Sequence, residues 1–566
     1  MDDSAPAGMQ SLPFWKRPSV WWVVVFAPLE LLLLTSVVAA NVELFTNIVC
    51  RVHNSGNVGV VAPPVGGIPY DAAAYSPWLN ATGTQANLGY GGAPQPTFSS
   101  CATDPVVQAA VAKLTTVLAT TAGVLSFLTV GWWGSLSDRL GRTTVIRVYI
   151  LGQFLPLLNT ILVVNFVDVL PGGYWFLLLD SVVLGLFGGI ATFTAALNAY
   201  MSDISTPETR SSNFSLGMGS LLLGMGIGPL AGSFVVRISG NVLNLYYAAL
   251  AFRLLVFCFS FAIPDSLSAE KKHLAAVKHR EELDVLGANR PHSRLKDILF
   301  FLEPLLILWP NPVPGITAQR QWGLLILAMA QGIFGLLAVS DLHLDRSQLI
   351  TANKSAMMPQ LLYALMTFDW DAEYVGYCLS SIGFARAIYL IGILPSIVKF
   401  AKNRHASKIR EMEREPLLHP GKLVPSAAAV DMQLARASAL VEIFICAMLP
   451  WAPSGVIFIA ILSFGCLGSG FGPAIHSVAL ELFSHKVGKE TAAVESGKLF
   501  GALGVGQALF GTLIGPPLYG FVYAATVATF PATIFYLSLV FVTISFILLH
   551  LIRLPRVVTD PSEDEV

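Results

Sequence analysis

Long apolar segments recur along almost the whole chain. A helix needs about 20 apolar residues to cross the hydrocarbon core of a bilayer, and twelve segments have a length near this or above it. They are residues 20–42, 107–137, 144–166, 174–201, 212–236, 242–263, 322–340, 372–398, 437–450, 454–482, 492–520 and 528–551. Only helices and closed barrels satisfy their backbone groups inside a bilayer, and barrel strands would alternate over about ten residues. The sequence therefore predicts an all-α membrane protein with twelve transmembrane helices.

Composition supports this fold class. The chain has 566 residues, of which 54% are hydrophobic and 12% are charged, and a soluble protein of this length would need more charge to cover its surface. The formal net charge of −1 argues against nucleic acid as a partner. The first apolar segment is too long and begins too late for a cleaved signal peptide.

The basic residues of the loops predict the orientation. An even number of spans puts both ends on one side, and Lys and Arg gather in the cytoplasmic loops. Two connections are rich in these residues, whereas the alternate loops hold few. The expected order is a cytoplasmic N-terminus (1–19), a six-helix bundle (20–264) with an outer loop (43–106), a cytoplasmic linker with amphipathic helices (265–321), a second six-helix bundle (322–552) with a cytoplasmic loop (399–436), and an acidic cytoplasmic tail (553–566).

The outer loops carry two further signals. Asn80 and Asn353 begin Asn-X-Ser/Thr sequences and are predicted glycosylation sites. Cys50 and Cys101 bracket the first outer loop, where the environment is oxidising, so we predict a disulfide between them. The alternative is two unrelated thiols. No spacing of residues predicts a metal site, and no cofactor is expected.

The turn after the second apolar segment reads Gly-Ser-Leu-Ser-Asp-Arg-Leu-Gly-Arg, residues 134–142. This turn resembles the signature between helices 2 and 3 of the major facilitator superfamily, whose twelve helices form two six-helix bundles. The gating residues implied by the resemblance are Gly134, Asp138, Arg139, Gly141, Arg142, Asp203 and Arg210. The family's helix-packing motif is matched by Gly224, Gly228, Pro229 and Gly232, with an echo at Gly515, Pro516 and Gly520 that two related halves would produce.

The resemblance implies a contact between the halves on the cytoplasmic side. Asp138 is expected against the start of helix 11, and Arg139 and Arg142 against acids such as Asp203. A positive-inside anchor without a gating role is the alternative. The family's second basic residue is replaced by Thr143, so one contact is either missing or supplied by Arg147.

A narrower resemblance is carried by three short stretches. Residues 40–44, 101–105 and 132–133 resemble fungal members of the superfamily that are related to the proton-coupled folate transporter and to tetracycline-type drug antiporters.

Ionisable residues within the apolar segments are functional candidates, because charge is expensive inside hydrocarbon. Glu30 and Arg386 lie near mid-membrane, and we predict that they pair between the halves and serve substrate or proton coupling. A fixed structural ion pair is the alternative. The other cavity candidates are Asp180, Asn198, Gln331 and His476, and for His476 a structural role is the alternative to titration.

Four further charged residues are assigned local roles. Arg253 is expected to have a structural partner or to reach the membrane surface, and Glu442 to reach water. Glu495 and Lys498 are expected to pair locally.

These features together predict secondary active transport of a small organic solute by alternating access, coupled to protons. A drug/proton efflux antiporter is the alternative, and a transporter-like sensor without transport is the alternative from another class. The protein is not expected to be an enzyme. Its expected partners are the solute, protons and the lipid bilayer, and it is expected to act as a monomer. An acidic dileucine pattern at residues 413–418 suggests a vacuolar or endosomal membrane, with the plasma membrane as the other location.

Overall fold

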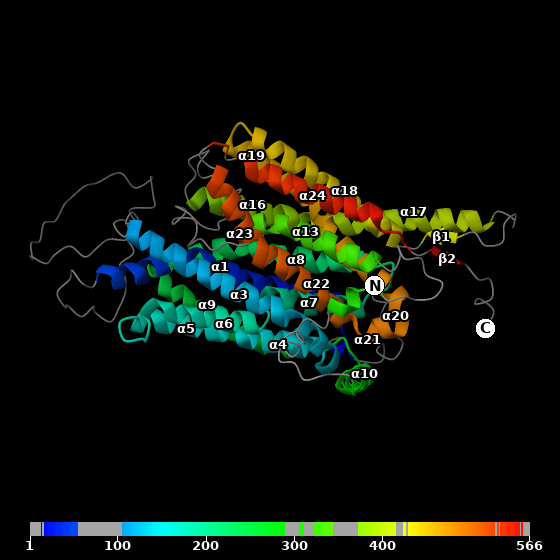
Figure 1. Cartoon of the computed structure of the whole chain (residues 1–566), viewed down its shortest axis with the longest axis horizontal. Helices are drawn as coiled ribbons and strands as arrows, with labels where there is room; N and C mark the ends of the chain where they lie inside the picture. Colours follow the sequence, from blue (N-terminus) through cyan, green and yellow to red (C-terminus); the bar gives the residue numbers. More distant parts are fainter. Residues whose placement is uncertain are drawn as a thin grey trace, which may run out of the picture.

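The computed structural model describes residues 13, 16–54, 105–288, 305–310, 322–342, 372–414, 423–425, 428–526, 529–530, 532–554 and 556–558. Two sets of helices lie side by side along the length of the molecule (Figure 1). The first half consists of α1 (Val20–Asn54), α3 (Pro105–Leu140), α4 (Arg142–Gly152), α5 (Phe154–Phe166), η3 (Gly173–Leu177), α6 (Leu178–Leu186), α7 (Gly189–Asp203), α8 (Arg210–Ser239) and α9 (Val242–Ser260).

The second half repeats this arrangement with more interruptions. It consists of α13 (Gly323–Leu342), α16 (Ala372–Ile388), η5 (Tyr389–Ile393), α17 (Leu394–Arg414), α18 (Ala428–Met448), η6 (Leu449–Trp451), α19 (Gly455–Phe464), η7 (Gly465–Gly470), α20 (Phe471–Val487), α21 (Lys489–Val494), α22 (Ser496–Gln507), η8 (Ala508–Ile514), α23 (Gly515–Thr526) and α24 (Thr533–Leu551). The elements η5 and η8 are π-helical turns.

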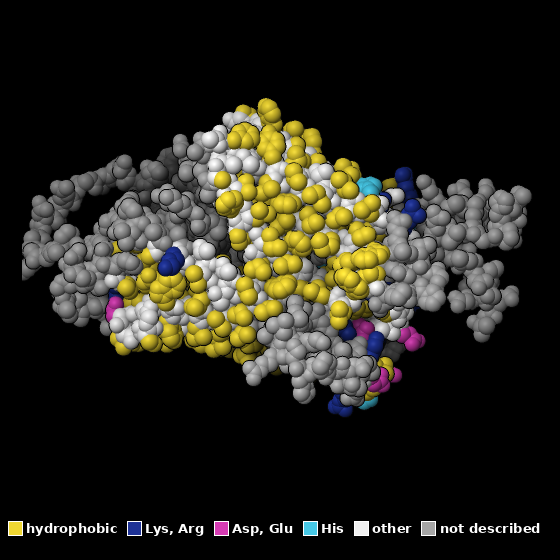
Figure 2. All heavy atoms as spheres, in the orientation of Figure 1, with side chains coloured by type: hydrophobic (Ala, Val, Ile, Leu, Met, Phe, Trp, Pro, Cys, Tyr) yellow, Lys and Arg dark blue, Asp and Glu magenta, His cyan; other side chains and the backbone are white. Residues whose placement is uncertain are grey.

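The predicted fold class is confirmed. Eleven segments of the described residues are long and apolar enough to cross a membrane, by length and composition, and Gly323–Leu337 is a shorter apolar helix. Figure 2 shows hydrophobic side chains over most of the visible helical body, with charged side chains gathered at the end near α10 and α17.

Three helices are longer than the sequence predicts. The first continues to Asn54 rather than ending at residue 42, so the start of the predicted outer loop is helical. The eighth continues through α17 to Arg414, and the ninth begins at Ala428 rather than Ala437. The charged extensions of the eighth and ninth helices lack the apolar composition of a membrane span. The apolar pattern therefore predicts an end of the eighth helix that is too early and a start of the ninth that is too late.

Three elements lie outside the two halves. The helix predicted in the linker is α10 (Ala269–Ala288), but it is not amphipathic as predicted, because its apolar residues do not gather on one face. Two short strands were not predicted: β1 (Leu423–Pro425) pairs antiparallel with β2 (Arg556–Val558). Figure 1 shows α10 and both strands at the end of the molecule that carries the α3–α4 turn. We call this end the Asp138 end.

Within each half, specific pairs of helices pack closely against each other. In the first half α8 packs along α1, and side-chain atoms added at Gly224, Gly228 or Gly232 would collide with atoms of Pro28, Thr35 or Ser36. The predicted packing motif therefore lies at a helix contact. In the second half α13 packs against α22 and η8, and α23 starts at Gly515 directly after η8.

Helices of opposite halves also touch. The α3 helix packs against α22, and α8 packs against α16. One apolar core includes Phe193 and Tyr200 of the first half together with Phe471, Phe483 and Phe500 of the second. The two halves are thus closed against each other at the level of these residues.

Candidate functional site between the two halves

The Asp138 cluster, formed by Asp138, Arg142, Asp203 and Ser496, joins the end of α3 to the start of α22. Asp138 accepts hydrogen bonds from the backbone N–H groups of Gly497 and Lys498, each with an N–O distance of 2.8 Å. The first N–H groups of a helix lack partners within the helix, and the helix dipole is positive there. A buried carboxylate of one half therefore caps a helix of the other half.

Arg142 holds the polar groups of this cluster together. Its Nη1 donates to Asp138 Oδ1 at 2.5 Å and its Nε to Asp203 Oδ2 at 3.0 Å. Its Nη2 reaches Ser496 Oγ at 2.7 Å, and Ser496 donates to Asp203 Oδ1 at 3.1 Å. The Arg142 side chain has 0% exposure, which an arginine tolerates only when its charge is paired. Ser496, which belongs to the second half, therefore binds both Arg142 and Asp203 of the first half.

Glycine permits the short distance between these helices. A Cβ atom at Gly134 would lie 2.6 Å from both the Gly497 carbonyl oxygen and the Gly501 Cα. Gly141, with φ 105°, ends α3 in a conformation that favours glycine, and the Asp265 carboxylate occupies the space of its missing Cβ. Asp265 also accepts a hydrogen bond from the Arg142 backbone N–H at 3.1 Å.

Among the contacts predicted for this turn, the one between Arg142 and Asp203 is confirmed. Asp203 is held by Arg142, whereas Arg139 Nε donates to the Ser135 carbonyl of its own helix at 3.4 Å. Arg147 does not take the place of the basic residue that Thr143 replaces. Its guanidinium donates to the carbonyls of residues 260 and 263 within the first half, both at 3.2 Å, because a residue one turn into α4 faces α9 rather than α22.

The Lys402 cluster, formed by Lys402, Asp431, Ser477, Arg210 and Glu481, lies in the corresponding place of the second half. Lys402 Nζ is 3.1 Å from Asp431 Oδ2 and donates to the Pro207 carbonyl at 3.1 Å. Ser477 donates to the same Asp431 oxygen at 2.6 Å. Because Pro207 precedes α8, the lysine links the second half to the first.

An ion pair completes the Lys402 cluster. Arg210 of α8 lies 3.4 Å from Glu481 of α20, so it also crosses between the halves. The charges are inverted relative to the Asp138 cluster: there an acid binds backbone N–H groups, and here a lysine binds a backbone carbonyl. Arg210 was predicted from the motif, but Lys402, Asp431 and Glu481 were missed.

The missed residues carried a usable signal. Lys402 lies past the predicted end of the eighth helix at Val398, and Asp431 lies before the predicted start of the ninth, so both were counted as loop charges. Placing the second half on the first would have aligned the starts of the third and ninth helices, where Arg142 and Asp431 now stand.

The predicted pairing of Glu30 with Arg386 is wrong. Both Glu30 carboxylate oxygens accept from Arg253 Nη1 at 2.5 Å, and both side chains are buried. This pair joins α1 to α9 within the first half. Depth along a helix is readable from sequence, but the direction a side chain faces depends on helix rotation, and α1 turns Glu30 away from the second half.

Arg386, on the eighth helix, lies near residues of its own half. Cys466 of η7 is under the electrostatic influence of both Arg386 and Glu442, which places these residues in the second half. Glu442 is buried, contrary to the prediction that it reaches water, because its helix starts nine residues earlier than predicted. Glu495 also differs: its ion pair is with Lys278 of α10 at 2.8 Å.

The other predicted cavity residues separate into different places. Gln331 and His476 are brought together, with their Nε2 atoms 3.2 Å apart. Asp180 accepts hydrogen bonds from Asn159 at 2.7 Å and Thr160 at 3.0 Å, all within the first half. Asn198 is partly accessible on α7 and belongs to neither cluster.

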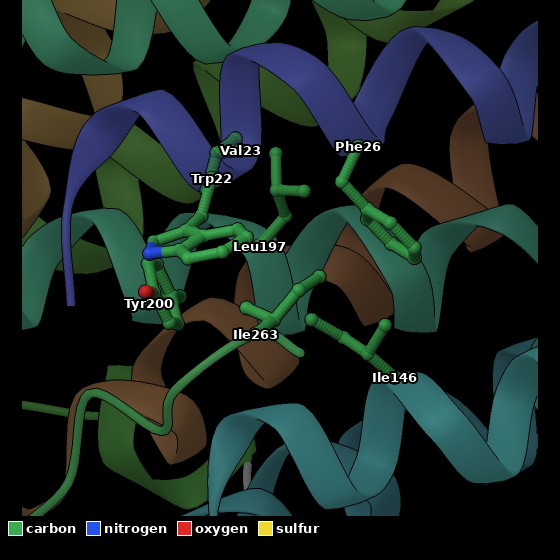
Figure 3. Close-up of a pocket in the computed structure, with 7 residues that line it drawn as sticks. All are labelled: Trp22, Val23, Phe26, Ile146, Leu197, Tyr200 and Ile263. Atoms are coloured by element: carbon green, nitrogen blue, oxygen red, sulfur yellow. The ribbon is translucent and has the colours of Figure 1, made fainter. Parts of the chain in front are cut away.

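A small apolar cavity lies within the first half (Figure 3). Figure 3 shows the Trp22 indole beside Tyr200 at one side and Phe26 at the other. Its lining residues are Trp22, Val23, Phe26, Ile146, Leu197, Tyr200 and Ile263. All of these precede the second half, so this cavity is not a passage between the halves.

The predicted outer features fall only partly within the described residues. Cys50 is in a disulfide, whereas Cys258, Cys378, Cys446 and Cys466 are thiols. Its predicted partner Cys101 lies outside the described residues, as do Asn80, Asn353 and the two leucines of the dileucine pattern, residues 417–418.

Long apolar helices in two related halves, joined by polar clusters at one end, define a multi-pass membrane protein of the transporter type. Residues 74–409 match the family model of the Major Facilitator Superfamily, and the chain belongs to this family. It is a membrane transporter.

Relatives and solved structures agree with this assignment. The chain is 22% identical over 465 residues to the uncharacterized membrane protein YJL163C of Saccharomyces cerevisiae, covering 78% of this chain and 76% of that protein. It is 23% identical over 402 residues to the MFS-type transporter avaJ of Aspergillus versicolor, covering 70% and 69%. The crystal structure of the human organic anion transporter MFSD10 (TETRAN) is similar in fold, with a TM-score of 0.59, 16% identity and coverage of 95% of this chain and 100% of that chain.

Proposed function

We propose that this transporter moves a small organic solute by alternating access and that a proton gradient drives the movement. The observation that carries the proposal is the Asp138 cluster, in which polar groups of one half close on a helix end of the other. Hydrogen bonds of this kind exchange with water when the halves separate, so their net contribution is about 0.5–3 kcal/mol each. Such an interface is strong enough to close one side and weak enough to open again.

We place the Asp138 end in the cytoplasm. The α17 helix carries Lys399, Lys402 and Arg404 at this end, and the linker helix α10 adds further lysines. Cytoplasmic loops of membrane proteins are enriched in Lys and Arg. This orientation puts both termini in the cytoplasm and the predicted glycosylation sites on the outer side.

Proton coupling is the second part of the proposal. Its support is two titratable groups within apolar helices that have no ion-pair partner, of the kind that Glu30 has, among the described residues. Asp180 is held by neutral donors, and His476 by a neutral amide. The pairing of Glu30 with Arg253 supports instead the interpretation of Glu30 as a fixed structural ion.

Transport by reconstituted protein tests the proposal. The full chain is placed in liposomes, a pH gradient is imposed in either direction, and uptake is measured over a panel that begins with organic anions and continues with drugs. Symport predicts accumulation when the outside is acidic, and efflux antiport predicts it when the inside is acidic. Folded protein that moves no member of the panel above empty liposomes would contradict transport and favour a sensor. Asp168→Asn is the matched control for Asp138→Asn, because Asp168 pairs with Arg51 on an exposed surface of the first half.

A further inference from the structure

His476 of α20 lies at the interface between the two halves. Its ring lies 5.7 Å from that of Phe214 on α8 and 5.6 Å from that of Phe500 on α22, with interplanar angles of 72° and 86°. Phe214 and Phe500 lie one helical turn beyond Arg210 and Ser496. The imidazole and the two phenyl rings therefore form the layer directly inside the two polar clusters.

The hydrogen bond of His476 suits both of its protonation states. A neutral ring accepts at Nε2 from the Gln331 amide nitrogen, at 3.2 Å. A protonated ring donates at both nitrogens, and it then needs an acceptor at Nε2. Gln331 Oε1 is buried and has no hydrogen-bond partner among the described residues. Rotation of the amide therefore presents an acceptor to the imidazolium.

The charged groups described near the ring have partners of their own, including Asp431 of α18, which lies 3.1 Å from Lys402 Nζ. On α8 and α20, Arg210 and Glu481 pair with each other, and His485 lies 3.4 Å from the same glutamate. Lys486 donates to carbonyls of residues 307 and 309. On α22, Lys498 stands at the Asp138 cluster, and α13 carries no charged residue from 323 to 337.

A proton added to His476 would thus create a charge beside two phenyl rings and the Gln331 amide, with no ion-pair partner among the described residues. An unpaired charge in such a place is strongly unfavourable unless water reaches it. The residue as a whole is partly accessible, and a proton is taken to reach it while the Asp138 end is closed. Hydration is available once that end opens, and protonation therefore favours the open arrangement.

The α20 helix connects this site to the contacts between the halves. Ser477 follows His476 and binds Asp431 at 2.6 Å, and Glu481 binds Arg210 across the interface at 3.4 Å. A shift of α20 that relieves the charge on His476 would pull on the Arg210–Glu481 pair. Opening at the layer of rings and opening of the Lys402 cluster are thereby linked.

We propose that His476 is the residue whose protonation opens the Asp138 end, with Gln331 as its positioning partner. The proposal rests on the proposed function and names the proton-coupling residue of the transport cycle. It gives the proton a direction: the proton enters while the end is closed and leaves to the side on which that end opens.

A thiol reporter tests this without knowledge of the solute. Val130 is fully buried, and its Cγ2 lies 3.1 Å from the position of a Cβ at Gly504 of α22. Val130→Cys is introduced into full-length protein in lipid nanodiscs, with alanine at the four native thiols. Labelling by a polar maleimide is measured from about pH 8 to about pH 5.5, which spans the ordinary titration of histidine. Dividing by the labelling rate of the same cysteine in denatured protein at each pH removes the effect of pH on the thiol itself.

We expect labelling to rise about tenfold with acid in the native background, equivalent to about 1.4 kcal/mol, and to show no such rise in His476→Gln. His550→Gln, at a histidine bonded to a carbonyl of its own helix, is the matched control and should respond like the native protein. Gln331→Glu places a carboxylate beside the ring, which favours its protonated form, so the midpoint should move up by about 1–3 pH units.

The outcomes separate the two proposals. An acid response of the same size in His476→Gln as in the native protein, or a midpoint unchanged by Gln331→Glu, overturns the assignment of His476 and leaves the proposed transport standing. If the reporter stays protected in Asp138→Asn at every pH, the gating role of the Asp138 end fails, and the assignment of His476 fails with it.

Discussion

Replacement of Asp138 by asparagine should open the Asp138 end. The carboxylate accepts from the Gly497 and Lys498 N–H groups, both at 2.8 Å, from a helix that belongs to the other half. Asparagine keeps one acceptor oxygen, but its amide nitrogen cannot accept from the second N–H group. The Arg142–Asp203 bond lies within the first half and persists in either state, so it does not enter the difference.

The magnitude follows from these contacts. Loss of one hydrogen bond to a charged group removes about 1.5–3 kcal/mol, and conversion of the other to a neutral bond removes about 0.5–1 kcal/mol more. The total of about 2–4 kcal/mol corresponds to a roughly 30- to 700-fold shift from closed to open.

The assay is labelling of the Val130→Cys reporter at about pH 8, where histidine is ordinarily neutral. Asp168→Asn is the control, because it makes the same chemical change at an ion pair within the first half. If the two variants label at the same rate while both elute as monodisperse folded protein, the cluster does not hold the halves together.

Three further predictions concern residues around the site. Lys402→Met should raise labelling of the Val130 reporter roughly 10- to 140-fold, because it removes a charged donor worth about 1.5–3 kcal/mol between the halves; unchanged labelling would show that this lysine acts within its own half alone. Glu30→Gln should lower the free energy of unfolding by about 3–5 kcal/mol, because it leaves Arg253 buried and unpaired. Thermal unfolding in detergent measures the loss, and a native midpoint would mean that water already reaches the arginine. Gly134→Ala should prevent full closure, because its Cβ would lie 2.6 Å from backbone atoms of α22 and overpacking of this kind costs about 1–3 kcal/mol; a reporter as protected as in the native protein would contradict this.

The motif between the second and third helices shows how far local sequence reaches. Gly134, Asp138 and Gly141 were predicted from the resemblance, and the structure gives each a local reason: close approach, a charge at a helix end, and a turn that favours glycine. Arg142 was predicted with them, but Arg139 was given the same partner. Two arginines three residues apart leave a helix end in different directions, and only the placement of α7 and α22 decides which one is buried.

The charged residues within the membrane-spanning helices show what local sequence does not predict. Sequence identified Glu30, Arg253, Arg386 and His476 as residues within apolar helices, and each lies within one. It paired Glu30 with the wrong arginine, because similar depth in the membrane does not imply a shared helix face. Gln331 and His476 were likewise separate candidates until α13 and α20 brought them to 3.2 Å.

The class of the helices and their order along the chain followed from the sequence alone, because a bilayer accepts only long apolar helices. That constraint acts on each segment separately and needs no knowledge of its neighbours. The partners of the buried charges, the inverted Lys402 cluster and the ring layer around His476 were decided by tertiary structure. Each depends on the rotation and approach of helices far apart in the chain, which packing between their faces determines and the order of residues along one helix does not.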